Sequence, residues 1–212
     1  MPRFQTIGLF MASALALNLT PGPAIMFILS RCLGEGRAAA VVSVFGLAGA
    51  SIIHAVAAAV GVAALFAYSP VAFAIIKYCG AAYLVYLGLS GLRKGGISGL
   101  LVPRQTRALR PLLKIYWQGF VTDLLNPKLL LFFFSFLPQF VDPERGSPSI
   151  QMLVLGLLFQ VTGVPTNLAV ALSGGAVARL IARRPIWARI QSWCASAILV
   201  GLGVRLASSD RH

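Results

Sequence analysis

Long stretches without a charged residue alternate along this chain with short segments rich in lysine and arginine. A helix needs about 20 mostly apolar residues to cross the hydrocarbon core of a bilayer. Proline-containing motifs interrupt the first and the fourth of these stretches. The pattern predicts an all-α membrane protein of about six transmembrane helices. They are expected at 4–30, 38–67, 70–92, 115–141, 149–178 and 190–206.

The composition supports this prediction. Of 212 residues, 58% are hydrophobic and 11% are charged, and the mean hydropathy is +0.84. A soluble domain is about 25% charged, and one of this size would leave roughly a third of its surface exposed to water. The net charge of +13 does not indicate nucleic-acid binding, because the basic residues sit in short loops between uncharged runs. Lipid is therefore the expected surrounding.

The distribution of basic residues predicts the orientation in a bacterial inner membrane. Twelve lysines and arginines fall on one side of the predicted bundle and four on the other, and the richer side is expected to be cytoplasmic. Both termini are then periplasmic, and a basic cytoplasmic loop at 93–114 separates the three-helix units 1–92 and 115–212. The richer side holds Arg31, Arg37, Arg93, Lys94, Arg104, Arg107, Arg110, Lys114, Arg179, Arg183, Arg184 and Arg189, and the other holds Arg3, Arg145, Arg205 and Arg211.

The two units repeat each other in sequence. At a constant spacing of 115 residues, Pro70 matches Pro185, Cys79 matches Cys194 and Gly88 matches Gly203. Because each unit has three helices, the second must enter the membrane upside down. Inverted repeats with broken helices are typical of secondary transporters, whose binding site lies where the repeats meet. An uncoupled small-solute channel or a membrane scaffold is the alternative.

The two interruptions are the first candidate binding elements. Thr20-Pro21-Gly22-Pro23 and Asn126-Pro127-Lys128 cannot continue a regular helix, because proline lacks an N–H and glycine is conformationally free. Each break leaves a new helix N-terminus, near Pro23 and near Lys128, whose unpaired N–H groups suit a carboxylate. Two simple kinks, with neighbouring helices satisfying the backbone, are the alternative.

Ionisable residues inside the spans are the second candidates, since a charge at membrane depth is costly and usually functional. Lys128 could bind a substrate carboxylate, and Asp123 could bind an ammonium group or carry a coupling proton; a purely structural pair is the alternative. His54, one turn after Ser51, is a second proton-coupling candidate or a histidine hydrogen-bonded within the bundle. A polar stripe around Pro165 could line the cavity or bridge helices. It consists of Gln160, Thr162, Thr166 and Asn167.

Enzymatic motifs are missing from the sequence. It contains no GxSxG elbow, no HExxH pair, no metal-spaced cluster of cysteine and histidine and no phosphate-binding loop. We therefore predict no catalytic residue, no metal site and no cofactor.

Both breaks also resemble a known family. Asn18-Leu19-Thr20-Pro21-Gly22-Pro23 and Asp123-Leu124-Leu125-Asn126-Pro127-Lys128, followed by Leu137-Pro138-Gln139-Phe140-Val141, are similar to the signatures of the lysine exporter (LysE/RhtB) family. The resemblance implies efflux of amino acids such as lysine, arginine, threonine, homoserine or leucine by proton antiport. Whether the protein forms a homo-oligomer is left open. Position 123 is often Asn in such proteins, and Ser51 falls where some carry an intramembrane acid. That family has also been drawn with five spans and a cytoplasmic N-terminus. The distribution of basic residues in this sequence instead predicts six spans and a periplasmic N-terminus.

The substrate-binding residues expected from the breaks and the resemblance form one set. They are Thr20, Pro21, Gly22, Pro23, Asp123, Asn126, Pro127 and Lys128.

Overall fold

A computed structural model describes residues 4–20, 22–68 and 111–183 continuously, together with isolated residues between 71 and 89 and between 193 and 208. The described residues form helices and no strands. The helices expected at 70–92 and 190–206 lie outside the continuous ranges, as do residues 93–110 of the loop expected at 93–114, whose last residues belong to a helix that begins at Leu112. The inverted repeat, which depends on those two helices, therefore stays a prediction.

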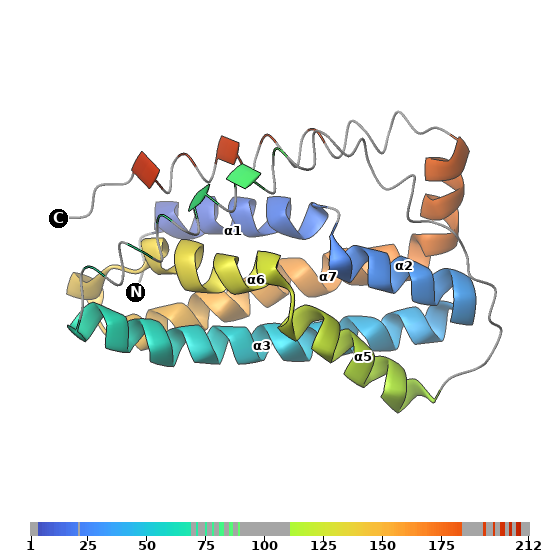
Figure 1. Cartoon of the computed structure of the whole chain (residues 1–212), viewed down its shortest axis with the longest axis horizontal. Helices are drawn as coiled ribbons and strands as arrows, with labels where there is room; N and C mark the ends of the chain where they lie inside the picture. Colours follow the sequence, from blue (N-terminus) through green and yellow to red (C-terminus); the bar gives the residue numbers. More distant parts are fainter. Residues whose placement is uncertain are drawn as a thin grey trace.

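Two pairs of helices are bent at the predicted breaks. Helix α1 (Phe4–Leu19) is followed by α2 (Pro23–Glu35) at an angle of 48°. Helix α5 (Leu112–Leu124) is followed by α6 (Pro127–Leu131), and Pro127–Phe140 is inclined to α5 by 49°. Figure 1 shows both breaks near the middle of the bundle, with α1 and α6 toward one end and α2 and α5 toward the other. The interruptions predicted in the first and fourth helices are confirmed.

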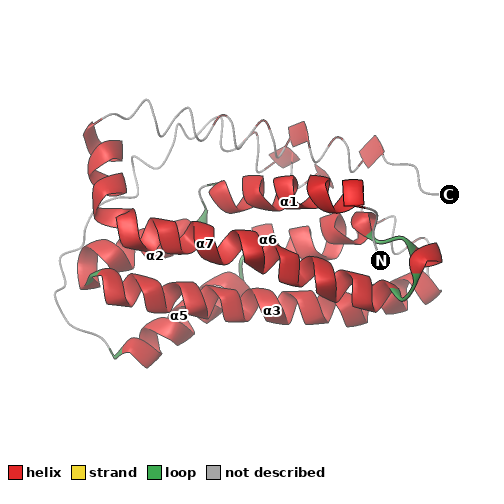
Figure 2. Cartoon of the chain, turned by 180° about the vertical axis from the view of Figure 1, so that it is seen from behind, coloured by secondary structure: helices red, strands yellow, loops and turns green. Residues whose placement is uncertain are grey.

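The other two long helices are continuous. They are α3 (Arg37–Tyr68) and α7 (Pro148–Arg183), and α7 continues through Pro165 in its interior. By length and composition, Arg37–Gly61 and Pro148–Gly174 can each cross a membrane, and each bent pair adds one span if it is counted as a single unit. The described residues thus hold two to four candidate spans of the six expected. Figure 2 shows that the described elements are helices joined by short loops.

The chain after α6 departs from regular α-helix, which the sequence did not predict. A π-helix, η2 (Phe132–Phe136), leads into the 3₁₀ segment η3 (Leu137–Phe140), and η4 (Pro143–Arg145) follows. Pro138 has no N–H to donate to the preceding turn, so the α-helical ladder cannot continue past it. Such π segments often occur near functional sites.

Helices α3 and α5 cross in very close contact because glycines lie at the crossing. A methyl group at Gly46 would lie 2.2 Å from the carbonyl oxygen of Tyr116, and one at Gly119 would lie 3.0 Å from the carbonyl oxygen of Ser43. Small residues allow this approach between helix backbones in membranes. The pair α3–α5 is therefore a tightly joined unit against which the other helices pack.

Aromatic side chains pack together between α1, η2, η3 and α7. Rings there contact one another with centroids 5.0 to 5.9 Å apart. The members are Phe10, Phe132, Phe133, Phe136, Phe140 and Phe159.

Outward faces of α3 and α7 expose large apolar side chains, an arrangement that suits lipid and not water. On α3 these are Phe45, Ile52, Ile53, Val56 and Val60, and on α7 they are Leu153, Leu157, Val161 and Leu172.

Candidate functional site

The first break is formed by the end of α1 and an extended glycine. The N–H of Thr20 still donates to the carbonyl oxygens of Ala16 and Leu17, and the Thr20 hydroxyl donates to Ala16 O at 2.8 Å. Gly22 is extended (φ −163°, ψ −172°), and Pro23 opens α2 without any side-chain cap. Pro21 lies outside the described residues. The first turn of α2 therefore keeps backbone N–H groups that no capping side chain occupies.

The second break is organised by the side chain of Asn126. Its Oδ1 accepts the backbone N–H of Lys128 at 3.1 Å, and its Nδ2 donates to Asp123 Oδ1 at 3.2 Å. This is an N-cap. The expectation of an unpaired N–H near Lys128 is thus wrong at this break, because the asparagine of the motif already satisfies it.

Lys128 joins the two breaks. Its Nζ donates to the carbonyl oxygens of Leu17 and Thr20, both at 3.1 Å, and the residue is only 9% exposed. Those carbonyls belong to the C-terminal end of α1, which carries partial negative charge. An ammonium group has three donors, so among the described residues one N–H remains for a further acceptor. No ion pair within 4.0 Å joins Lys128 to Asp123 in the described part.

Asp123 is buried at the end of α5, with 2% of its surface exposed. Its carboxylate accepts from the Ser51 hydroxyl at 3.0 Å and from Asn126 Nδ2 at 3.2 Å. A carboxylate offers about four acceptor positions. The two contacts fix the orientation of the group and leave acceptor positions for a bound proton or ammonium.

His54 lies behind Asp123, on the α3 face that also carries Ser51. Its Nε2 lies 3.2 Å from the backbone oxygen of Asp123, and its ring stacks on Phe133 with centroids 5.9 Å apart. The residue is 3% exposed and does not line the cavity described next. The structure therefore brings His54 against the backbone of Asp123 and not into the cavity.

A small cavity of about 30 Å³ lies between the two breaks. Its volume holds about two water molecules. Asp123, Asn126 and Lys128 give it one acidic, one amide and one basic group. The remaining lining residues are Asn18, Ala24, Ile25, Leu47, Ala48, Ser51, Leu129, Phe159, Gln160, Gly163, Val164 and Asn167.

The predicted polar stripe of α7 divides between two roles. Gln160 and Asn167 line the cavity, and Gln160 Nε2 also donates to the Ala48 carbonyl at 2.7 Å. Thr162 accepts from Asn18 Nδ2 at 3.1 Å and so bridges α7 to α1.

Asn18 is a lining residue that was not selected from the sequence, although it opens the first motif. Among the other predicted site residues, Thr20, Gly22, Pro23 and Pro127 shape the breaks but do not line the cavity.

No three His, Cys, Asp or Glu side chains converge on a metal site within the described ranges. The chemistry available in the cavity is the recognition of opposite charges in a small, partly apolar space.

Comparisons with known proteins give one consistent family. A family model described as LysE type translocator matches residues 15–210. The leucine efflux protein of Salmonella typhimurium is 28% identical over 204 residues, which cover 94% of this chain and 93% of the relative. The homoserine/homoserine lactone efflux protein of the same organism is 32% identical over 173 residues, which cover 82% and 80%.

An uncharacterised membrane protein of Pseudomonas aeruginosa is 32% identical over 194 residues, covering 90% of this chain and 89% of the relative. No solved structure matches the chain. The family match covers both breaks and the cavity between them. The chain is a membrane protein of the LysE family of translocators.

Proposed function

We propose that this protein exports amino acids, or similar small zwitterionic metabolites, from the cytoplasm by proton antiport. The observation that carries the proposal is a cavity that places a buried acid, Asp123, and a buried base, Lys128, at the junction of two broken helices. Relatives named for leucine and homoserine efflux support the substrate class. The site is built from binding groups, and the family is one of translocators, so no catalytic step is proposed.

The substrate carboxylate would bind between Lys128 and the start of α2. Lys128 Nζ lies beside Gly22, where an added methyl group would be 3.3 Å away. Ala24 and Ile25, in the uncapped first turn of α2, line the same cavity. A helix N-terminus and an ammonium group both favour an anion. Gly22 keeps this space open.

The substrate ammonium would bind at Asp123, where acceptor positions remain beside the Ser51 and Asn126 contacts. The rest of the lining is largely apolar, with Leu47, Leu129, Phe159 and Val164 facing the cavity. One acid and one base match the two charges of the amino-acid backbone. An uncharged side chain of the substrate would then meet apolar surface, which favours neutral amino acids over cationic ones.

Proton coupling would follow if Asp123 binds either a proton or the substrate ammonium, but not both at once. The carboxylate can hold a proton or a substrate ammonium, and a charge left uncompensated at this depth is costly. Substrate binding would release the proton, and substrate release would allow its return. His54 would hold the Asp123 backbone in place, and it is the second candidate for the proton.

The cavity is too small for the substrate in the described conformation. A volume of about 30 Å³ accommodates water but not an amino acid. Transport therefore requires opening toward each side in turn, as in inverted-repeat transporters. We place the protein in the bacterial inner membrane with six spans in two inverted repeats, supported by the charge distribution and the two matching breaks.

Substrate efflux from reconstituted vesicles tests the proposal. Vesicles containing the full chain are loaded with radiolabelled leucine, homoserine or lysine, and efflux is followed with and without an imposed pH gradient. We expect efflux of the neutral amino acids that accelerates when protons are supplied on the opposite side. Efflux that ignores the gradient would support an uncoupled channel, and no efflux of any amino acid would refute the proposed function.

A further inference from the structure

Helix α2 is a short helix with a glycine at each end. Pro23–Glu35 begins after Gly22, which is extended, and ends before Gly36, whose φ of +93° is a backbone conformation that favours glycine. A methyl group at Gly36 would meet no atom within 4 Å, so space does not explain the glycine. The two flanking residues can absorb large backbone rotations, as hinges require.

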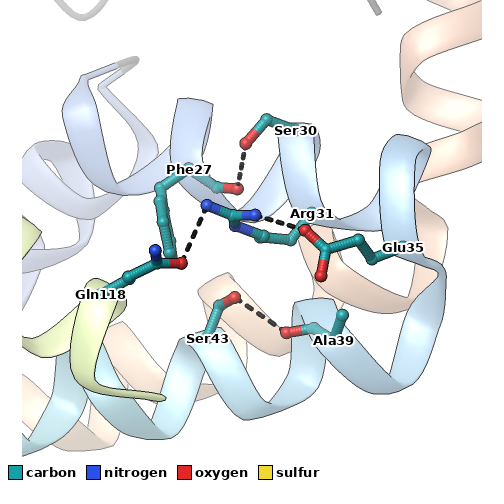
Figure 3. Close-up of polar contacts among 7 residues, drawn as sticks. All are labelled: Phe27, Ser30, Arg31, Glu35, Ala39, Ser43 and Gln118. Atoms are coloured by element: carbon teal, nitrogen blue, oxygen red, sulfur yellow. Dashed lines mark hydrogen bonds and ion pairs between the residues drawn. The ribbon is translucent and has the colours of Figure 1, made fainter. Parts of the chain in front are cut away.

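A polar cluster near the end of α2 holds it against α5 (Figure 3). Arg31 pairs with Glu35 one turn later, and its Nη2 donates to Gln118 Oε1 of α5 at 3.1 Å. Its guanidinium carbon lies 4.8 Å from the centroid of the Phe27 ring. The Arg31 and Glu35 side chains are only 16% and 8% exposed. The bond to Gln118 joins residues 87 positions apart and crosses between the two broken helices.

Helix α5, which the Arg31–Gln118 bond joins to α2, is the less mobile of the two helices. Helix α5 is locked to α3 by backbone contact at Gly46 and Gly119. Helix α2 rests on that pair through side chains, such as Phe27, whose ring would lie 3.2 Å from a methyl group at Gly119. Its polar contact with α7, from the Cys32 thiol to Ala171 O at 3.4 Å, is a weak one. Among the described residues, movement of α2 against α3 and α5 would break the Arg31–Gln118 bond and shift the apolar packing around the buried Ile28, which has no fixed directional bonds.

The cluster lies between the cavity and one end of the bundle. Ile25 lines the cavity, and Arg31 is six residues further along α2, or about 9 Å. Gln118 precedes Asp123 on α5 by five residues, or about 7.5 Å. Both helices lead toward the end that carries Arg37 and Lys114, as Figure 1 shows for their course. The cluster thus lies on the path from the cavity to the basic end.

The closed cluster is not fully satisfied. Arg31 Nε and Glu35 Oε2 are buried without a hydrogen-bond partner among the described residues. Buried unpaired polar atoms cost free energy that water would remove. An open arrangement, in which water reaches both atoms, recovers that loss and offsets the broken bond to Gln118.

We propose that α2 is the gate between the cavity and the basic end of the bundle, and that the Arg31–Gln118 bond is its latch. When the bond breaks, α2 rotates about Gly22 and Gly36 and withdraws Ala24 and Ile25 from the cavity lining. Arg31 and Gln118 are positioning residues that do not touch the substrate. The inference rests on the proposed function, because it assigns the gate of the same transport cavity.

Accessibility of a cavity cysteine tests the gate. The probe is Ala48→Cys in a full-length chain whose three native cysteines are replaced by alanine. A charged, membrane-impermeant thiosulfonate is applied to vesicles of each orientation, and the labelling rate is measured. Gln118→Leu removes the acceptor, and Gln118→Glu strengthens the latch with a charged one. Ser30→Ala is the matched control on α2, since within the described part of the chain its exposed hydroxyl bonds only to Phe27 O of its own helix, at 2.8 Å.

We expect Gln118→Leu to raise labelling from the basic side about threefold to tenfold, the change expected from losing one hydrogen bond. Gln118→Glu should lower both this labelling and the export rate, and Ser30→Ala should change neither. Unchanged labelling in both Gln118 variants, with export intact in the parent chain, would overturn the gate. If labelling responds as expected but the parent exports no amino acid, the gate stands and the proposed function falls.

Discussion

The ammonium nitrogen of Lys128 lies 3.1 Å from the backbone oxygen of Thr20, 108 residues earlier in the chain. The break after α1 frees carbonyl groups at a depth where lipid provides no donor. Lys128, from the second break, supplies the donor for Thr20 and for Leu17. Each break is therefore completed by the other, and the charge that a substrate would meet is held in place by backbone.

Replacing Lys128 by methionine should abolish most export. Methionine keeps much of the volume but removes both hydrogen bonds and the charge. The Thr20 carbonyl then loses its Lys128 donor, at a cost of roughly 1–3 kcal/mol, while the Leu17 carbonyl keeps the N–H of Thr20. We expect initial efflux rates in reconstituted vesicles to fall about 10- to 100-fold. Lys114→Met is the control, because Lys114 is exposed at the start of α5. Equal rates in the two variants would mean that Lys128 is not part of the site.

Close contact between α3 and α5 predicts a strong effect of a single methyl group. Gly46→Ala places that group 2.2 Å from the Tyr116 carbonyl oxygen, which belongs to backbone and cannot move alone. Overpacking of this kind costs about 1–3 kcal/mol. We expect the thermal midpoint in detergent to fall by roughly 2–10 °C. Gly8→Ala, whose methyl group would meet nothing within 4 Å, should leave it unchanged, and a similar midpoint for both would contradict this packing.

The positions of the helix breaks could be predicted because their causes are local. Proline and glycine disturb the helical turn in which they lie, whatever the helix packs against. Thr20–Pro23 and Asn126–Lys128 therefore indicated the two interruptions without knowledge of the packing. The same reasoning identified Asp123 and Lys128, since an ionisable residue in an apolar run is conspicuous by composition alone.

The partners of these residues could not be predicted, because they come from distant parts of the chain. Nothing in the sequence near Lys128 indicates that Thr20 O accepts a hydrogen bond from its ammonium group, and nothing near Asp123 indicates that Ser51 donates to its carboxylate. The Arg31–Gln118 bond is of the same kind. Such contacts depend on how the helices pack. A hydrophobic pattern indicates which face of a helix is buried, but it does not indicate which residues of another helix that face contacts.

Reporter fusions will test the orientation predicted from the charges. Because twelve basic residues fall on one side and four on the other, a fusion after Lys94 should report a cytoplasmic position and one after Asp210 a periplasmic position. Alkaline phosphatase and a fluorescent protein, which are active on opposite sides, provide complementary readings. A cytoplasmic reading from the fusion after Asp210 would overturn the arrangement of six spans with both termini outside.

The last prediction concerns Asp123 as the site of proton coupling. Asp123→Asn preserves the shape of the group, and an amide can still meet the Ser51 hydroxyl and Asn126 Nδ2. It cannot exchange a proton in the way that a carboxyl group does. Efflux by this variant should therefore continue at a reduced rate and lose most of its dependence on the pH gradient. Asp142→Asn, a change of the same kind at a half-buried position between η3 and η4, should keep the parent profile. An Asp123→Asn protein with the parent rate and pH profile would make Asp123 a structural residue, and His54, against its backbone, would become the next candidate.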